Sequence, residues 1–109
     1  MIFELREYQA AEGKIEQLHA RFLDDTLDLF KRHGIEVLGF WSRKDDPSIL
    51  VYLCRFADEE QKRAAWEAFG SDPDWIRVKT ESETDGPLTA RMSSYLLEPV
   101  SYFEHKQRG

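Results

Sequence analysis

The amino-acid sequence predicts a single α+β domain in which helices cover one face of a four-stranded antiparallel sheet. The length of 109 residues leaves room for one domain only. Hydrophobic residues make up 41% of the chain and charged residues 33%, a mixture with enough apolar bulk to form a folded core. The order of the strand-like and helix-like segments carries the rest of the prediction.

The first half of the chain predicts a strand, a long helix and a second strand. Residues Ile2–Tyr8 alternate in polarity and include aromatic and branched side chains, which is typical of a strand. Residues Lys14–His33 place apolar side chains at helical spacing, and Gly34 is suited to end that helix. The next strand is predicted over Ile35–Arg43. The apolar stripe of the helix comprises Ile15, Leu18, Phe22, Leu23, Leu27, Leu29 and Phe30.

The second half predicts two further strands with helical segments between them. The turn sequence KDDPS leads into a strand over Ile49–Phe56. Asp58 and Gln61 are spaced as in a capping box, so a helix is expected from there to Phe69. The sequence DGP then breaks the chain before the last strand, Thr89–Leu97.

A joint interrupts the second helical region at the sequence AFGSDPDWIRV. Gly70 is expected to end one helix, the Ser-Asp pair after it offers caps, and a second helical segment is predicted over Pro73–Thr80. Trp66 and Trp75 flank this joint, so the two indoles can meet at the corner. Packing alone explains such a joint, and a second possibility is that it also walls a pocket.

The order strand, helix, strand, strand, helix, strand is the split β-α-β, or ferredoxin-like, arrangement. The strand Ile49–Phe56 is apolar on both faces, and in the second strand Val37 and Trp41 are expected opposite Leu38 and Phe40. Both faces of the sheet should therefore be buried, although two helical regions can cover only one. The sequence predicts that an identical chain covers the other, giving a homodimer through the sheet faces and a dimeric α/β barrel.

Composition also limits the partners and the location of the protein. The net charge is −6, and 15 Lys and Arg are interleaved with 21 Asp and Glu, which argues against nucleic acid and against an anionic membrane surface. The N-terminus has no signal-peptide pattern and the longest apolar run, ILVYLC, is too short to span a bilayer, so a cytoplasmic protein is expected. The lone Cys54 is predicted to be a buried core thiol. Residues 1–97 form the predicted domain and 98–109 a tail.

Polar side chains on the first strand are the best candidates for a ligand site. Glu4, Arg6 and Tyr8 share one face of this strand, while Phe3 and Leu5 share the other and are expected to meet the helices. The planar guanidinium of Arg6 could hold a carboxylate or carbonyl oxygen of a ligand. The alternative is an ion pair between Glu4 and Arg6 that only neutralises buried charge.

We expect Arg6 and Tyr8 to line a small-molecule pocket together with Tyr95 of the last strand and His19 of the first helix. This pocket would lie between the sheet and the helices or at the dimer interface. The other histidines suggest no chemistry, because His33 lies at a helix end and His105 in the tail. Histidines at these separations show no metal-site spacing, so neither a metal nor another cofactor is predicted.

Three sequence stretches in order resemble one protein family: FELREYQAAEGKIEQL, HGIEVLGFW and VYLCRFADEEQKRAAWEAFGSDPDW. They are similar to the NIPSNAP family, within the dimeric α/β-barrel superfamily. The resemblance covers Ile2–Trp75 and is most specific over Leu53–Trp75. It implies a ferredoxin-like subunit and a dimer, but no established reaction.

Three classes of function remain open. The first is a NIPSNAP-type protein that binds a small organic ligand, and the second is a cofactor-free monooxygenase acting on a phenolic or polycyclic substrate. The third is a haem-binding or haem-degrading relative, with His19 as a possible axial ligand. Haem-degrading sites of this superfamily resemble an Asn, Trp and His set, and the chain contains no Asn. There is no phosphate loop, dinucleotide-binding glycine pattern or Ser-His-Asp arrangement, which argues against nucleotide-dependent and hydrolytic enzymes.

Overall fold

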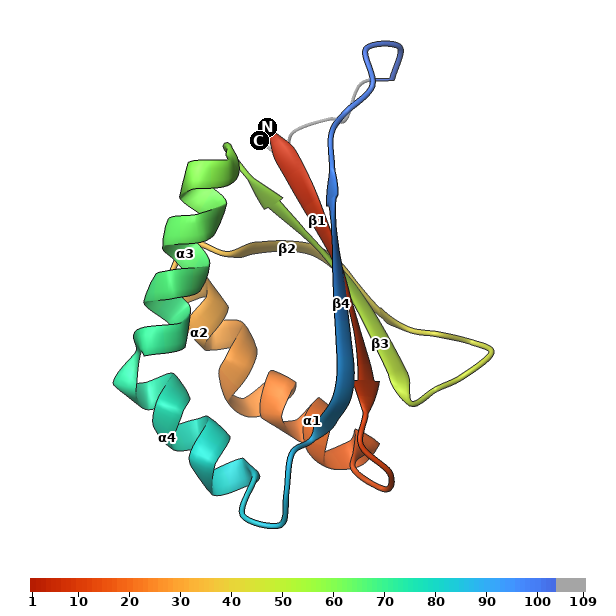
Figure 1. Ribbon diagram of the computed structural model, residues 1–109, viewed down its shortest axis with the longest axis vertical. Coiled ribbons are helices and arrows are strands. Elements are labelled where there is room, and N and C mark those ends of the chain that lie inside the picture. Colours follow the sequence, from red (N-terminus) through yellow and green to blue (C-terminus); the bar gives the residue numbers. More distant parts are fainter. Residues whose placement is uncertain (104–109) are drawn as a thin grey trace.

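The structure is a computed structural model that describes residues 1–103, so His105 and the end of the predicted tail lie outside the described residues. Helices and strands follow in the predicted order (Figure 1). The elements are β1 (Ile2–Ala10), α1 (Ile15–Arg21), a π-helical turn η1 (Phe22–Thr26), α2 (Leu27–Arg32), β2 (Glu36–Ser42), β3 (Ile49–Phe56), α3 (Glu59–Ser71), α4 (Pro73–Ser82) and β4 (Thr89–Leu97).

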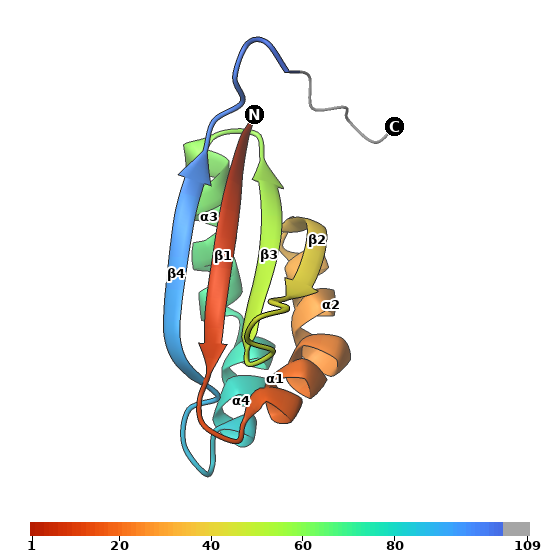
Figure 2. The same cartoon turned by 90° about the vertical axis from the view of Figure 1, so that its right-hand side faces the viewer.

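The sheet has the strand order β2-β3-β1-β4, and all neighbouring strands are antiparallel. The helices lie together on one of its faces (Figure 2). The α+β class and the four-stranded antiparallel sheet predicted from the sequence are confirmed. Within residues 1–103, no helix is long and apolar enough to cross a bilayer.

The first helical region is not one continuous α-helix, because η1 interrupts it. A π-turn holds one residue more than an α-turn and so rotates the side chains that it carries. Thr26 is buried there and donates its hydroxyl to the carbonyl oxygen of Arg21 at 3.1 Å. Leu23, which the sequence pattern placed in the apolar stripe, is 77% exposed as a result.

The prediction of which face of β1 meets the helices is wrong. Glu4 pairs with Cys54 and Arg6 with Tyr52, so these residues lie on the face that packs against the helices. Leu5 lies on the opposite face, which we call the outer face. Alternation along a strand separates two sets of side chains, but it does not say which set faces the helices.

The second strand contains a bulge that the sequence pattern did not reveal. Val37 pairs with Cys54, whereas Gly39 pairs with Leu53, so the register shifts between them. An extra residue in a strand reverses the alternation beyond it. Val37 therefore packs toward the helix-side core, while Trp41 lies on the outer face, contrary to the prediction that they share a face.

The joint between α3 and α4 is built around Asp72 and Phe69. α3 continues through Gly70 and ends at Ser71, two residues beyond the predicted end at Phe69. Asp72 caps α4 by accepting from Asp74 N at 2.8 Å. The ring centroid of Phe69 lies 5.9 Å from that of Trp66 and 4.7 Å from that of Trp75. Phe69 therefore bridges the two indoles that we expected to meet directly.

The Asp72 side chain also ties α4 to the end of α2. Its Oδ2 lies 2.6 Å from His33 Nε2 and accepts from Arg32 Nη1 at 2.9 Å. The hydrogen bond to His33, the backbone N–H of Asp74 and the nearby Arg32 lower the pKa of Asp72 to about 2, from an ordinary 3.8. Because the pKa is lower in the folded state, ionised Asp72 stabilises the fold above the ordinary pKa, and this contribution is lost as the pH falls through about 2.

We therefore predict that Asp72→Asn makes stability less sensitive to acid. Asparagine still caps a helix, so this substitution removes mainly the charge. Urea unfolding measured between about pH 4 and pH 2 should show a shallower loss of unfolding free energy in Asp72→Asn than in the wild type. Asp24→Asn is the matched control, because Asp24 is exposed and forms no ion pair within residues 1–103. Equal slopes for all three proteins would contradict the prediction.

Candidate ligand-binding site beside β4

A cluster of polar and aromatic side chains is buried between the sheet and the helices. Glu4, Arg6 and Tyr8 reach it from β1, Tyr52 from β3 and Trp66 from α3. We call these five residues the Arg6 cluster. Its members are brought together by strand pairing and by the packing of α3 on the sheet, since 62 positions separate Glu4 from Trp66.

Arg6 is the centre of this cluster and donates to every neighbour that can accept. Its Nε donates to the Tyr52 hydroxyl at 2.8 Å, and its Nη2 to the Tyr8 hydroxyl at 2.9 Å. Nη1 donates to Glu4 Oε2 at 3.0 Å. The two tyrosine hydroxyls are also hydrogen-bonded to each other at 2.7 Å. The guanidinium is therefore held in one orientation from several sides.

Glu4 and Trp66 complete this support. Glu4 is 2% exposed, and its second oxygen accepts from Trp66 Nε1 at 2.8 Å. The Arg6 guanidinium carbon lies 4.1 Å from the centroid of the Trp66 ring, which is a cation–π arrangement. The ion pair between Glu4 and Arg6 that the sequence offered as an alternative is present. It is one contact in a larger network rather than an isolated pair.

The electrostatics of the cluster keep Arg6 charged and Tyr52 neutral. Burial acts to lower the pKa of Arg6, but Tyr52, Tyr8 and Glu4 outweigh it and the pKa is raised. Burial, followed by the neighbouring Tyr8, raises the pKa of Tyr52 well above its ordinary value. The site therefore presents a fixed guanidinium and a neutral Tyr52 hydroxyl beside it.

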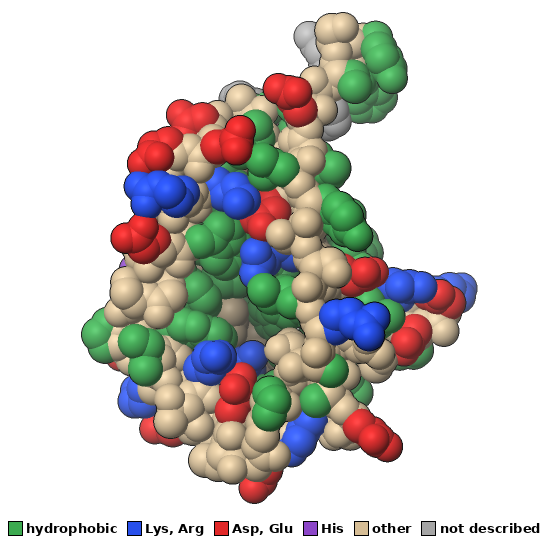
Figure 3. Space-filling model, viewed as in Figure 1, with side chains coloured by type: hydrophobic (Ala, Val, Ile, Leu, Met, Phe, Trp, Pro, Cys, Tyr) green, Lys and Arg blue, Asp and Glu red, His purple; other side chains and the backbone are tan. Residues whose placement is uncertain are grey.

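The cluster opens to solvent beside the edge strand β4. Met92 pairs with Tyr8 and Leu96 with Glu4, so both lie on the helix side of the sheet, yet they are 57% and 45% exposed. The helices thus leave β4 uncovered. Figure 3 shows the resulting hollow between β4 and the helices α3 and α4, with hydrophobic and charged side chains at its base. Arg6 Nη2 reaches Met92 Sδ at 3.4 Å, which places the guanidinium at the edge of this groove.

The structure brings together only part of the predicted ligand set. Arg6 and Tyr8 are in the cluster. Tyr95 pairs with Leu5, so it lies on the outer face and is 58% exposed. His19 is exposed on α1, and its imidazole forms no hydrogen bond, ion pair or ring contact within the described chain. The sequence analysis missed Tyr52 and Trp66, because their roles depend on strand register and on the placement of α3.

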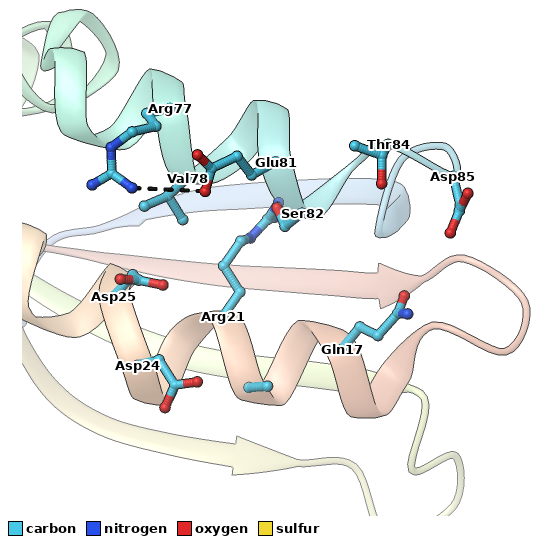
Figure 4. Close-up of a pocket in the computed structure, with 11 residues that line it drawn as sticks. Gln17, Arg21, Asp24, Asp25, Arg77, Val78, Glu81, Ser82, Thr84 and Asp85 are labelled. Carbon is cyan, nitrogen blue, oxygen red and sulfur yellow. Dashed lines mark hydrogen bonds and ion pairs between the residues drawn. The ribbon is translucent and has the colours of Figure 1, made fainter.

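A second depression lies between α1, η1 and α4, with a volume of about 430 Å³ (Figure 4). Arg21 extends across it from α1, and its Nη1 donates to Ser82 Oγ at 3.1 Å and to Glu83 Oε2 at 3.0 Å. Arg77 pairs with Glu81 on the same helix at 3.7 Å. The cations of this depression are therefore already paired. Among residues 1–103, no group of three or more His, Cys, Asp or Glu side chains is arranged to hold a metal ion.

Comparison with known proteins places this fold in a family. The NIPSNAP family model matches residues 3–104, which is most of the chain. The chain belongs to the NIPSNAP family. An uncharacterised NIPSNAP domain protein from Burkholderia xenovorans superposes with a TM-score of 0.82 at 20% identity, covering 96% of this chain and 100% of that one. A NIPSNAP-family protein of unknown function from Agrobacterium tumefaciens gives 0.80 at 19% identity, covering 94% and 91%.

The same fold extends to proteins named for a reaction. A putative antibiotic biosynthesis monooxygenase from Nitrosomonas europaea superposes on this NIPSNAP protein with a TM-score of 0.65 at 12% identity, covering 92% of this chain and 99% of that one. At such identity the similarity concerns the fold alone. No curated protein sequence shows significant similarity to this chain.

Cys54 lies next to the Arg6 cluster, but its thiol is not suited to act as a nucleophile in this site. The thiol is fully buried, and burial, with the charge of Glu4, raises its pKa to about 12. A thiol reacts through its thiolate, so we predict that the folded NIPSNAP domain resists a thiol-labelling reagent at pH 8 and reacts fully after unfolding. Ser94→Cys, on exposed β4, is the control and should label quickly in the folded protein. Rapid labelling of Cys54 in the native wild type would contradict this prediction.

Proposed function

We propose that this NIPSNAP protein binds a small, flat organic molecule through an oxygen atom, in the groove beside β4. The observation that carries the proposal is the fixed guanidinium of Arg6 at the edge of an apolar groove. A guanidinium has five N–H donors, and one at Nη1 has no acceptor within residues 1–103. A phenol, carbonyl or carboxylate oxygen could take this position.

The groove walls favour an apolar ligand body. Met92 and Leu96 expose their side chains on one side, and the Trp66 ring already stacks on Arg6. Because the indole covers one face of the guanidinium, a ligand would approach the guanidinium from its edge. Because Glu4, Tyr8 and Tyr52 hold Arg6 in place before binding, little further ordering of the site is needed, and this supports binding.

We also propose that two chains associate through their outer sheet faces. The middle of this face is apolar, and Glu7 and the ion pair between Arg55 and Glu36 lie on the same face. A Cβ at Gly39 would collide with the Trp41 ring, so the indole lies close to the strand backbone there. Such a surface favours burial against a second copy, as an α/β barrel requires. The apolar residues of the outer face include Leu5, Trp41, Val51, Leu53, Tyr95 and Leu97.

A second candidate function is a cofactor-free monooxygenase acting on a phenolic or polycyclic substrate. The similarity in fold to proteins named as antibiotic biosynthesis monooxygenases favours it, as does a buried cation able to stabilise a phenolate oxygen. Oxygen consumption with a bound phenol would distinguish this activity from binding alone. The haem hypothesis gains no support from His19, which is exposed on α1 and is not a member of the Arg6 cluster.

The binding proposal is tested with a pair of compounds that differ in one oxygen, 2-naphthol and naphthalene. In equilibrium dialysis the wild type should bind 2-naphthol more tightly, because a hydrogen bond to a charged group is worth about 1.5–3 kcal/mol. Arg6→Lys keeps the charge beside Glu4 but loses the planar guanidinium. It should lower the affinity for 2-naphthol about ten-fold or more and leave the affinity for naphthalene unchanged.

Tyr8→Phe is a second variant in case Arg6→Lys fails to fold. It should also lower the affinity for 2-naphthol, because Arg6 loses one of the hydroxyls that hold its guanidinium in place. Tyr95→Phe on the outer face is the control and should bind like the wild type. Equal affinity of the wild type for both compounds would refute a role for the Arg6 cluster in oxygen recognition.

The dimer proposal predicts a light-scattering mass of twice the chain mass at micromolar concentration. Trp41→Glu should shift the protein toward the monomer, because it places a charge on the outer face. Ile76→Glu is the matched control, since Ile76 on α4 is 51% exposed and Trp41 is 55% exposed. A monomeric wild type, or equal effects of the two substitutions, would overturn the proposed interface.

A further inference from the structure

We propose that the segment after β4, residues 98–103, reaches a second copy of the chain and docks in that copy's apolar groove between α2 and β2. We call this segment the arm. The inference rests on the proposed homodimer and goes beyond it, because it assigns an occupant to a groove that the sheet-face interface does not use.

The arm projects from the end of the sheet and carries exposed apolar side chains. It extends past the N-terminal end of β1 in both views (Figures 1 and 2). Val100 is 45% exposed and Tyr102 is 87% exposed. Such side chains gain free energy when they are covered by another apolar surface.

The groove between α2 and β2 offers such a surface. Its volume is about 550 Å³, and its lining is mainly apolar. Two irregularities form it: the π-turn η1 directs Leu23 outward, and the bulge in β2 displaces the strand at Leu38. Leu27, Val37 and Phe40 complete the lining. The arm of the same chain does not fill this groove, as the exposure of Tyr102 shows.

The proposal takes the two-fold axis of the dimer to run along the strands, between two stacked sheets. Because β2 and β4 are opposite edges of the sheet, this axis would lay β4 of one copy over β2 of its partner. Across the sheet, Leu97 pairs with Phe3, Phe3 with Arg55 and Arg55 with Glu36, so these four residues lie at the same height along the strands. The arm therefore starts level with Glu36 at the beginning of β2, and it can pass around that free edge into the groove.

The area of the sheet also favours an additional contact. The four strands are nine, seven, eight and nine residues long. At about 3.3 Å per residue and about 4.8 Å between strands, they give a face of roughly 520 Å², or about 1,000 Å² for two copies. A stable interface buries about 1,600 Å² in total. Exchanged arms would provide much of the difference.

Disulfide trapping tests the proposal. Two single variants, Leu23→Cys and Tyr102→Cys, are mixed, allowed to exchange subunits and mildly oxidised. Both positions are exposed, so neither substitution should unfold the chain, and buried Cys54 can stay in place. We expect a covalent dimer containing one chain of each variant. Asp85→Cys, an exposed position in the loop before β4, replaces Leu23→Cys in the control and should give at least ten-fold less product.

Light scattering on the same samples separates the two proposals. If the protein is a dimer but Leu23→Cys and Tyr102→Cys give no more disulfide-linked dimer than the control pair, the arm exchange is overturned. The proposed sheet-face dimer is then unaffected. A double variant that closes its disulfide within one chain would also overturn the exchange. A monomeric wild type would overturn both proposals.

Discussion

The buried ion pair between Glu4 and Arg6 is the constraint on which the rest of the helix-side interior depends. Removing one partner of such a pair leaves an uncompensated charge, typically at a cost of about 3–5 kcal/mol. Trp66 must therefore present its indole N–H to Glu4, and Tyr8 and Tyr52 must direct their hydroxyls to Arg6. The observed position of α3 and the register of β1 against β3 satisfy these requirements.

This polar interior differs from an ordinary apolar core in its specificity. A hydrophobic contact tolerates small shifts, whereas the planar guanidinium accepts few arrangements of its partners. The cluster reaches the surface beside β4, where the helices leave Met92 and Leu96 uncovered. The same geometry therefore supports the fold and creates the groove to which we assign ligand binding.

The helix-side and outer faces of the sheet serve different ends. The helix side contains a network whose donors and acceptors are almost all satisfied within one chain, while the outer face and the arm expose apolar side chains such as Trp41 and Tyr102. Association through the outer face would place the β4 edge, and with it the mouth of the groove, near a partner chain. Ligand binding and dimer formation would then be coupled through the position of β4.

The sequence by itself determined the order of the elements, the capping of α3 by Asp58, the buried state of Cys54 and the family. These properties depend on local periodicity, on neighbouring residues and on extended sequence patterns. The sequence also marked Arg6 and Tyr8 as polar residues of one strand face. Only the tertiary structure decided that this face meets the helices, because alternation is symmetrical between the two faces of a strand. It also decided that Tyr52 and Trp66 join Arg6 while His19 and Tyr95 do not, since strand register, the π-turn and the bulge in β2 arise from long-range packing that no local pattern encodes.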